Sequence, residues 1–229
     1  MLKVGALVVL ATVLAPQLRP AQPIVRLITL GKFHGGEAKV ANGSSWLGLT
    51  PTDDGLQWRP MRIVTKTVKD ECIDQEGQRT GVEVGVVGSR PLFLVQGLIP
   101  PKSPVKTCMY APDGFTIPDD SEIEFPCHGV RGYGFRVIYR QVEYHGAVPV
   151  QLWLDRYEGK QLLFEWPNES LDPHNQLIWA GDLDGDGHMD LLMDLSEHYD
   201  VTQWTLFLSS GRRPGNFLEK VAVFRTIGC

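Results

Sequence analysis

The stretch Gly181-Asp182-Leu183-Asp184-Gly185-Asp186-Gly187-His188-Met189-Asp190 carries four aspartates at nearly every second position. Carboxylates this close together repel one another and raise each other's pKa, so a chain tolerates them best when a hard cation lies among them. Ca²⁺ takes about six to eight oxygen ligands, and loops of this spacing supply them at alternate positions around one turn glycine, here Gly187. The predicted ligands are the carboxylates of Asp182, Asp184, Asp186 and Asp190 and the backbone carbonyl of His188.

The segment that enters this loop does not resemble the entering helix of an EF-hand. The twelfth loop position, where an EF-hand has a bidentate glutamate, is Met193. The entering segment 175–180 is short and β-prone, and the exit 189–195 is apolar with a periodicity that fits strand or helix. Segments 205–210 and 221–224 read as further strands, and Asp194 is an additional candidate ligand if the chain turns back.

Residues 177–208 resemble the calcium-binding repeat of FG-GAP or integrin-propeller proteins, with Asp182, Asp184, Asp186 and Asp190 at its acidic positions. The resemblance implies a strand, an acidic loop that binds Ca²⁺, and a second strand. It covers one copy of about thirty residues, whereas a propeller is built from several blades. A complete propeller is therefore not implied.

The composition favours a turn-rich β protein and argues against a nucleic-acid partner. The chain has 229 residues, 24 glycines, 16 prolines and a formal net charge of −5. Glycine and proline at this level are typical of many short strands joined by turns, and an acidic chain is repelled by phosphate backbones.

Short strands are predicted through most of the chain, with turns at glycine and proline. Glu158-Gly159-Lys160 indicates a hairpin, and Ala111-Pro112-Asp113-Gly114 indicates a turn. The remaining predicted strands are 56–59, 62–68, 81–87, 91–96, 121–125, 134–144, 148–156 and 161–166. We expect an all-β fold of antiparallel sheets, sandwich-like or like part of a propeller, with the calcium-loop hairpin near its C-terminus.

The chain divides into a leader and two β regions. Lys3 precedes an apolar core at 4–15, which is too short for the roughly 20 residues that span a bilayer and indicates a signal peptide at 1–21. The N-terminal β region is then 22–145 and the C-terminal one 146–229, and the two regions can also form one domain. After cleavage no membrane span is expected, so the protein is predicted to be secreted or periplasmic.

The four cysteines are disulfide candidates, because an even number behind a signal peptide is typical of a secreted disulfide framework. They are Cys72, Cys108, Cys127 and Cys229. Three pairings are open, and the spacings do not choose among them. No two cysteines are close enough in sequence to indicate a zinc site.

These features favour a non-catalytic secreted or periplasmic module in which Ca²⁺ stabilises a β-hairpin, with a glycan or a protein as its ligand. The alternative is a secreted hydrolase with a supporting calcium site. The sequence shows no nucleophile–base pair in a recognisable setting, but catalytic groups can be distant in sequence. A pocket with convergent titratable groups away from 182–190 would favour the hydrolase.

Overall fold

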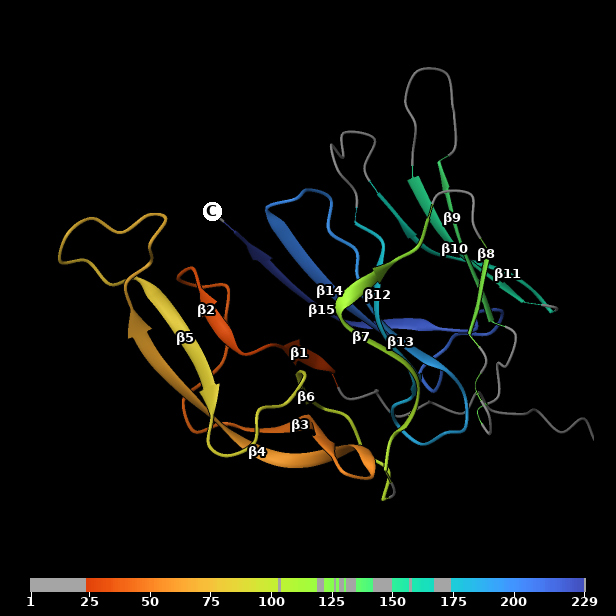
Figure 1. The fold of residues 1–229 in the computed structure, drawn as a ribbon, viewed down its shortest axis with the longest axis horizontal. Coiled ribbons are helices and arrows are strands. Elements are labelled where there is room, and N and C mark those ends of the chain that lie inside the picture. Colours follow the sequence, from red (N-terminus) through yellow and green to blue (C-terminus); the bar gives the residue numbers. More distant parts are fainter. Residues whose placement is uncertain are drawn as a thin grey trace, which may run out of the picture.

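The computed structural model describes residues 24–102, 104–118, 122–125, 127, 130, 135–141, 150–156, 158–166 and 174–228. Within these residues every regular element is a β-strand and all paired strands are antiparallel, which confirms the predicted fold class (Figure 1). The strands are β1 (Arg26–Ile28), β2 (Gly31–Phe33), β3 (Ser45–Thr52), β4 (Gly55–Val68), β5 (Gly81–Val86), β6 (Leu94–Gln96), β7 (Lys106–Thr116), β8 (Glu122–Phe125), β9 (Phe135–Gln141), β10 (Val150–Arg156), β11 (Gly159–Glu165), β12 (Gln176–Asp182), β13 (Asp190–Asp194), β14 (Val201–Leu208) and β15 (Glu219–Ile227).

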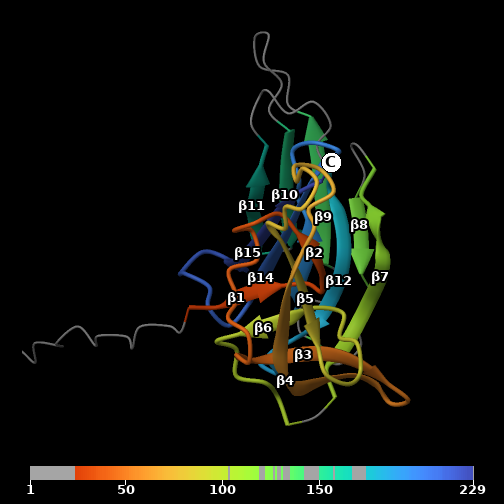
Figure 2. The ribbon, with the colours of Figure 1, turned by 90° about the vertical axis from the view of Figure 1, so that its left-hand side faces the viewer.

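The strands form three sheets. A six-stranded sheet has the order β1-β6-β3-β4-β5-β2, a four-stranded sheet β11-β10-β9-β8, and a five-stranded sheet β15-β14-β13-β12-β7. The four-stranded sheet and the β3–β4 hairpin lie at opposite ends of the molecule (Figures 1 and 2). The five-stranded sheet lies between them and carries the acidic loop.

The five-stranded sheet is apolar on both faces. On one face Ile178, Leu192 and Leu206 pack with the core of the six-stranded sheet. On the other face Leu191 and Phe207 pack with residues of the four-stranded sheet. Successive residues of a strand point to opposite faces, so a strand covered on both sides needs a continuous apolar run. This is why β12 and β13 read as unbroken apolar segments instead of alternating ones.

Two strands run through positions where the sequence predicts a break. The predicted strands 56–59 and 62–68 are one strand, β4, which pairs with β3 up to Arg62 and with β5 from Ile63 onward. The predicted turn at Ala111–Gly114 is a bulge inside β7, because residues 111–114 lie opposite the single residue Ile178 of β12. Gly114 has a φ of 78° there, which glycine adopts without steric cost.

Strands from both sides of residue 146 share sheets. β7 pairs with β12, and β9 pairs with β10, so two of the three sheets combine the two predicted regions. The predicted hairpin at 158–160 is present between β10 and β11, where Arg156 pairs with Gly159. The predicted signal peptide lies outside the described residues.

Two of the four candidate cysteines form a disulfide. Cys108 and Cys127 are bonded to each other, with 5.0 Å between their Cα atoms. None of the described cysteines is free, and Cys229 lies outside the described residues. No helix in the described part of the chain is long and apolar enough to cross a membrane.

Candidate metal centre

The acidic loop joins β12 to β13, two inner strands of the five-stranded sheet. The last pair of this hairpin ladder is Gly181 with Asp190, so the loop begins and ends on hydrogen-bonded strands. Gly185 and Gly187 both have a φ of 82°, in the left-handed region that favours glycine. The predicted turn glycine, Gly187, therefore has the backbone conformation that a tight metal-binding loop requires.

Three of the four loop aspartates converge. Asp182, Asp184 and Asp190 each offer a carboxylate oxygen, and these oxygens lie within 4.8 Å of one another. Protein oxygens bind Ca²⁺ at roughly 2.3–2.6 Å, so two ligands on opposite sides of one ion are about 5 Å apart. The oxygen-only donor set and its spacing both fit a calcium ion.

Asp182 and Asp190 are buried at the base of the loop. Asp182 accepts hydrogen bonds from the backbone N–H groups of Gly185 (2.8 Å) and Gly187 (3.1 Å). Asp190 accepts from the N–H groups of Leu183 (2.7 Å) and Ser209 (2.8 Å). These backbone donors fix both carboxylates in orientation, with one N–H on each oxygen.

Electrostatics at this cluster disfavour the ionised carboxylates in the absence of a cation. Burial raises the pKa of Asp190 well above its ordinary value, and the nearby charge of Asp184 contributes in the same direction. Burial also raises the pKa of Asp184, and the charges of Asp186 and Asp182 add to it. A divalent cation among these groups would reverse the balance, because it favours the charged form of each.

The fourth aspartate, Asp186, is exposed and lies outside the converging set. Its carboxylate accepts the backbone N–H of His188 at 2.8 Å and the hydroxyl of Ser209 at 3.0 Å. The same hydroxyl lies 3.0 Å from an oxygen of Asp190, so Ser209 connects the two carboxylates. The structure thus links Asp186 to the cluster through a serine, and it places His188 beside Asp186 at the partly exposed side of the loop.

Sequence reasoning missed the two serines that contact the loop. Ser209 is buried, and the hydroxyl of Ser210 donates to Asp184. Both follow β14, which pairs with β13 so that Leu191 lies opposite Phe207. The only signal in the sequence is a polar pair at the end of an apolar strand, and the register of β14 is needed to place that pair next to the aspartates.

The N-terminal sheet also supports the loop. The indole Nε1 of Trp58 on β4 donates to the backbone carbonyl of Leu183 at 2.9 Å, and the Leu183 side chain is fully buried. A residue 125 positions away in sequence therefore holds the first turn of the loop. Of the six tryptophans, three are buried and three are half-buried.

Two cavities flank the loop. One of about 410 Å³ has walls from Val25, Leu98, Leu208 and Val221 and includes Asp184 and Asp186 at its edge. The other, of about 520 Å³, lies between the acidic loop and the residues Pro101, Lys102, Pro104 and Lys106. The outer side of the cluster is therefore reachable from solvent on both sides.

The additional candidate ligand, Asp194, has a different use. It lies at the far end of β13 and accepts the backbone N–H groups of Gln203 at 2.9 Å and Ser196 at 3.2 Å. Burial raises the pKa of its carboxyl. The structure does not bring Asp194 into the cluster of loop aspartates.

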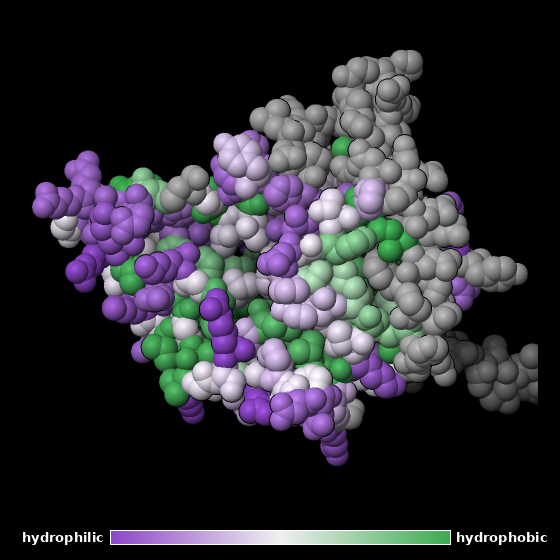
Figure 3. All heavy atoms as spheres, in the orientation of Figure 1, coloured by the Kyte–Doolittle hydropathy of each residue, from purple (hydrophilic) through white to green (hydrophobic). Residues whose placement is uncertain are grey.

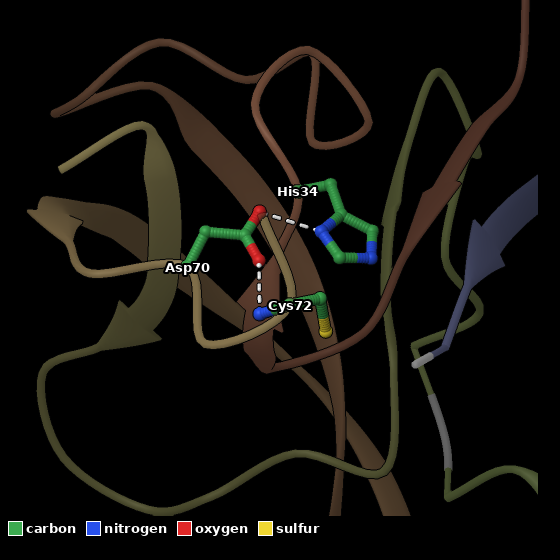
Figure 4. Close-up of side chains that lie close together, drawn as sticks. All are labelled: His34, Asp70 and Cys72. Atoms are coloured by element: carbon green, nitrogen blue, oxygen red, sulfur yellow. Dashed lines mark hydrogen bonds and ion pairs between the residues drawn. The ribbon is translucent and has the colours of Figure 1, made fainter. Parts of the chain in front are cut away.

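A second group of metal-ligand residue types consists of His34, Asp70 and Cys72, whose side chains lie close together (Figure 4). The sulfur of Cys72 is part of a disulfide and cannot act as a thiolate ligand. The imidazole Nδ1 of His34 lies 2.5 Å from an oxygen of Asp70, a hydrogen-bond distance with no space for an ion between them. This group is a hydrogen-bonded pair beside a disulfide.

Comparisons with known proteins do not assign the chain to a family. No protein-family model matches the chain, and no curated protein or solved structure matches it significantly.

Proposed function

We propose that this protein is a secreted or periplasmic calcium-binding β module in which Ca²⁺ stabilises the β12–β13 hairpin. The observation that carries the proposal is the convergence of Asp182, Asp184 and Asp190, two of them buried, within 4.8 Å. Asp186 and the carbonyl of His188 would complete the oxygen ligands. The FG-GAP-like character of the loop remains a prediction from its acidic pattern.

The position of the loop supports a structural role for the ion. β12 and β13 are buried almost throughout and contribute to both hydrophobic cores. Uncompensated carboxylates at the end of such a hairpin oppose folding, and a bound cation removes that opposition. Binding free energy is then expressed as folding stability, and millimolar extracellular calcium is sufficient even for a loosely built site.

The hydrolase alternative has partial support, because titratable groups converge in a cavity away from the acidic loop. Away from the acidic loop, a cavity of about 210 Å³ does gather His34, Asp70, Lys32, Lys69 and Glu71. No serine or threonine is among its described lining residues, and the one cysteine there is in a disulfide. Nucleophilic hydrolysis needs an activatable hydroxyl or thiol next to the base, so the cavity lacks the pair that defines such a site. The predicted glycan or protein ligand remains a prediction.

The test is calcium titration of the mature, oxidised protein by calorimetry, with thermal unfolding in EGTA, in Ca²⁺ and in Mg²⁺. We expect one calcium site per chain and a melting temperature that rises with Ca²⁺ and not with Mg²⁺, because the smaller ion demands a tighter octahedral geometry. Absence of heat and of any shift at about 10 mM Ca²⁺, well above the usual range for extracellular sites, would overturn the proposal.

A further inference from the structure

The first turn of the acidic loop is fixed at Leu183, the residue between Asp182 and Asp184. The backbone N–H of Leu183 donates to the carboxylate of Asp190 at 2.7 Å, and its backbone carbonyl accepts the indole N–H of Trp58 at 2.9 Å. The Leu183 side chain is fully buried in the core that the six-stranded sheet contributes to. The N–H, the carbonyl and the side chain of this residue are therefore all engaged, and the two aspartates beside it are placed by these three contacts.

The six-stranded sheet in turn fixes the indole ring of Trp58. Trp58 lies on β4, opposite Leu49 of β3. Its ring packs edge-to-face on Phe93, with 5.8 Å between the ring centroids and an angle of 84° between the ring planes. Leu49 and Phe93 are both buried, and the backbone N–H of Leu49 donates to the carbonyl of Phe93 at 3.1 Å. An aromatic ring packed in this way presents its N–H in one direction. Trp58 is therefore a rigid donor that points at the loop.

A second contact joins β4 to residues that lie beside the loop. The backbone N–H of Val105 donates to the carbonyl of Leu56 at 2.8 Å. Pro101 lies against Gly185, since a Cβ at Gly185 would be only 2.7 Å from the Cβ of Pro101. Hydrophilic side chains predominate along the lower edge of Figure 3, where the β3–β4 hairpin lies in Figure 1. The polar side of the hairpin thus faces solvent, while β4 faces the loop and the residues next to it.

We propose that Trp58 is a positioning residue of the calcium site and couples calcium binding to the packing of the six-stranded sheet on the loop. It acts through Leu183, whose N–H orients Asp190. Coupling between two events is reciprocal: a loop that Trp58 holds ready binds Ca²⁺ more tightly, and bound Ca²⁺ makes the Trp58–Leu183 hydrogen bond harder to break. The effect on calcium affinity rests on the proposed function, whereas the effect on the loop itself does not require calcium.

Trp58→Phe removes the N–H donor and keeps an aromatic ring next to Phe93. Without the donor, the Leu183 carbonyl loses its partner and the binding-competent loop is less populated. The loss of one such hydrogen bond changes an equilibrium by about threefold to tenfold. We therefore expect calcium affinity, measured by calorimetry on the folded variant, to fall by about threefold to tenfold. Protection of the Leu183 amide from hydrogen exchange in EGTA should fall by a similar factor.

Trp46→Phe is the matched control. Trp46 lies on β3 of the same sheet, is buried in the same core, and donates its indole N–H to the hydroxyl of Ser44 at 3.0 Å. The control therefore loses the same kind of hydrogen bond without removing the donor to Leu183. It should keep the wild-type calcium affinity and the wild-type protection of the Leu183 amide. Equal effects of the two substitutions on both quantities would refute the positioning role, because they would reflect a general loss of stability.

Hydrogen exchange of the wild type in EGTA tests the coupling without a variant and without calcium. The Trp58 indole N–H and the Leu183 amide should exchange through one opening, with the same dependence on urea. Separate openings for these two groups refute the coupling, and this measurement decides if Trp58→Phe does not fold.

Failure of this proposal can be distinguished from failure of the proposed function. If the wild type binds no Ca²⁺, the proposed function is refuted, and the exchange measurements in EGTA still decide whether Trp58 positions the loop. If the wild type binds Ca²⁺ and folded Trp58→Phe binds it equally tightly, the positioning role is refuted and the proposed function stands.

Discussion

Asp184→Asn should change the stability of the protein in opposite directions with and without calcium. The substitution is nearly isosteric, and an amide can still accept the Asp186 N–H, 3.2 Å away, and bond to the Ser210 hydroxyl. In EGTA it removes a carboxylate whose pKa is raised by burial and by the charges of its neighbours. The free energy of unfolding in EGTA should therefore be unchanged or higher by up to about 1 kcal/mol.

With calcium the same substitution removes a charged ligand. A unit charge about 2.4 Å from a divalent ion interacts by about 3 kcal/mol even at the dielectric constant of water. Since an amide oxygen replaces part of this interaction, we expect calcium affinity to fall about tenfold to a hundredfold, equivalent to about 1.4–2.8 kcal/mol.

These values set the expected shift in melting temperature. For a wild-type Kd of about 10⁻⁴ M, 10 mM Ca²⁺ stabilises the fold by about 2.7 kcal/mol, or about 5–10 °C for a chain of this size. In Asp184→Asn the same calcium should give about 0.4–1.4 kcal/mol, or about 1–5 °C.

The assay is differential scanning calorimetry of the wild type, Asp184→Asn and the control Asp54→Asn, each in EGTA and in 10 mM Ca²⁺ as above. Asp54 is exposed in the β3–β4 turn, so its substitution should leave the calcium increment unchanged. The reasoning is refuted if Asp184→Asn retains the full rise in melting temperature with calcium, because Asp184 would then not be a calcium ligand. It is also refuted if the variant is strongly destabilised in EGTA, because the charge of Asp184 would then not be unfavourable in the calcium-free protein.

Three further outcomes are expected. Ser209→Ala should lower the free energy of unfolding in EGTA by about 1–3 kcal/mol, because it removes a buried hydroxyl that contacts the carboxylates of Asp186 and Asp190. Ser210→Ala should lower it by less. Equal losses for the two variants in urea unfolding would contradict the role of Ser209 as the link between these carboxylates. Replacing Cys108 and Cys127 with alanine should cost about 3 kcal/mol, the chain-entropy value for a sequence separation of 19, and an unchanged urea midpoint would be the contrary result. In EGTA the free energy of unfolding should rise as pH falls from the raised pKa of Asp190 toward about 3.9, because the folded state binds the Asp190 proton more tightly than the unfolded chain. The additional stability from Ca²⁺ should shrink over the same pH interval. Thermal unfolding measured against pH, with and without Ca²⁺, checks both trends.

Much of the local structure could be predicted from the sequence because it depends on short spacings. The glycine conformation at Gly187, the hairpin at Gly159 and the strands on either side of the acidic loop follow from residues within a few positions of one another. The same local reasoning failed at Ala111–Gly114, since the turn residues there form a bulge within β7. A turn-forming sequence fixes a bend in the backbone, but the partner strand decides whether pairing resumes afterwards.

The candidate site divides in the same way. Covalent spacing alone brings four aspartates into one loop, so this part of the site follows directly from the order of the residues. Tertiary structure decided that Asp182, Asp184 and Asp190 converge while Asp186 is linked through Ser209, because the register of β14 and burial between two cores select the orientations.

The His34–Asp70 pair spans 36 positions and has no signal in the sequence at all. The hydrogen bond from the Ile227 N–H to Glu37 likewise forms only because β15 ends beside the N-terminal sheet. Residues near in sequence are constrained by bond geometry, whereas contacts between distant residues depend on the free energy of packing whole sheets, which no short pattern encodes.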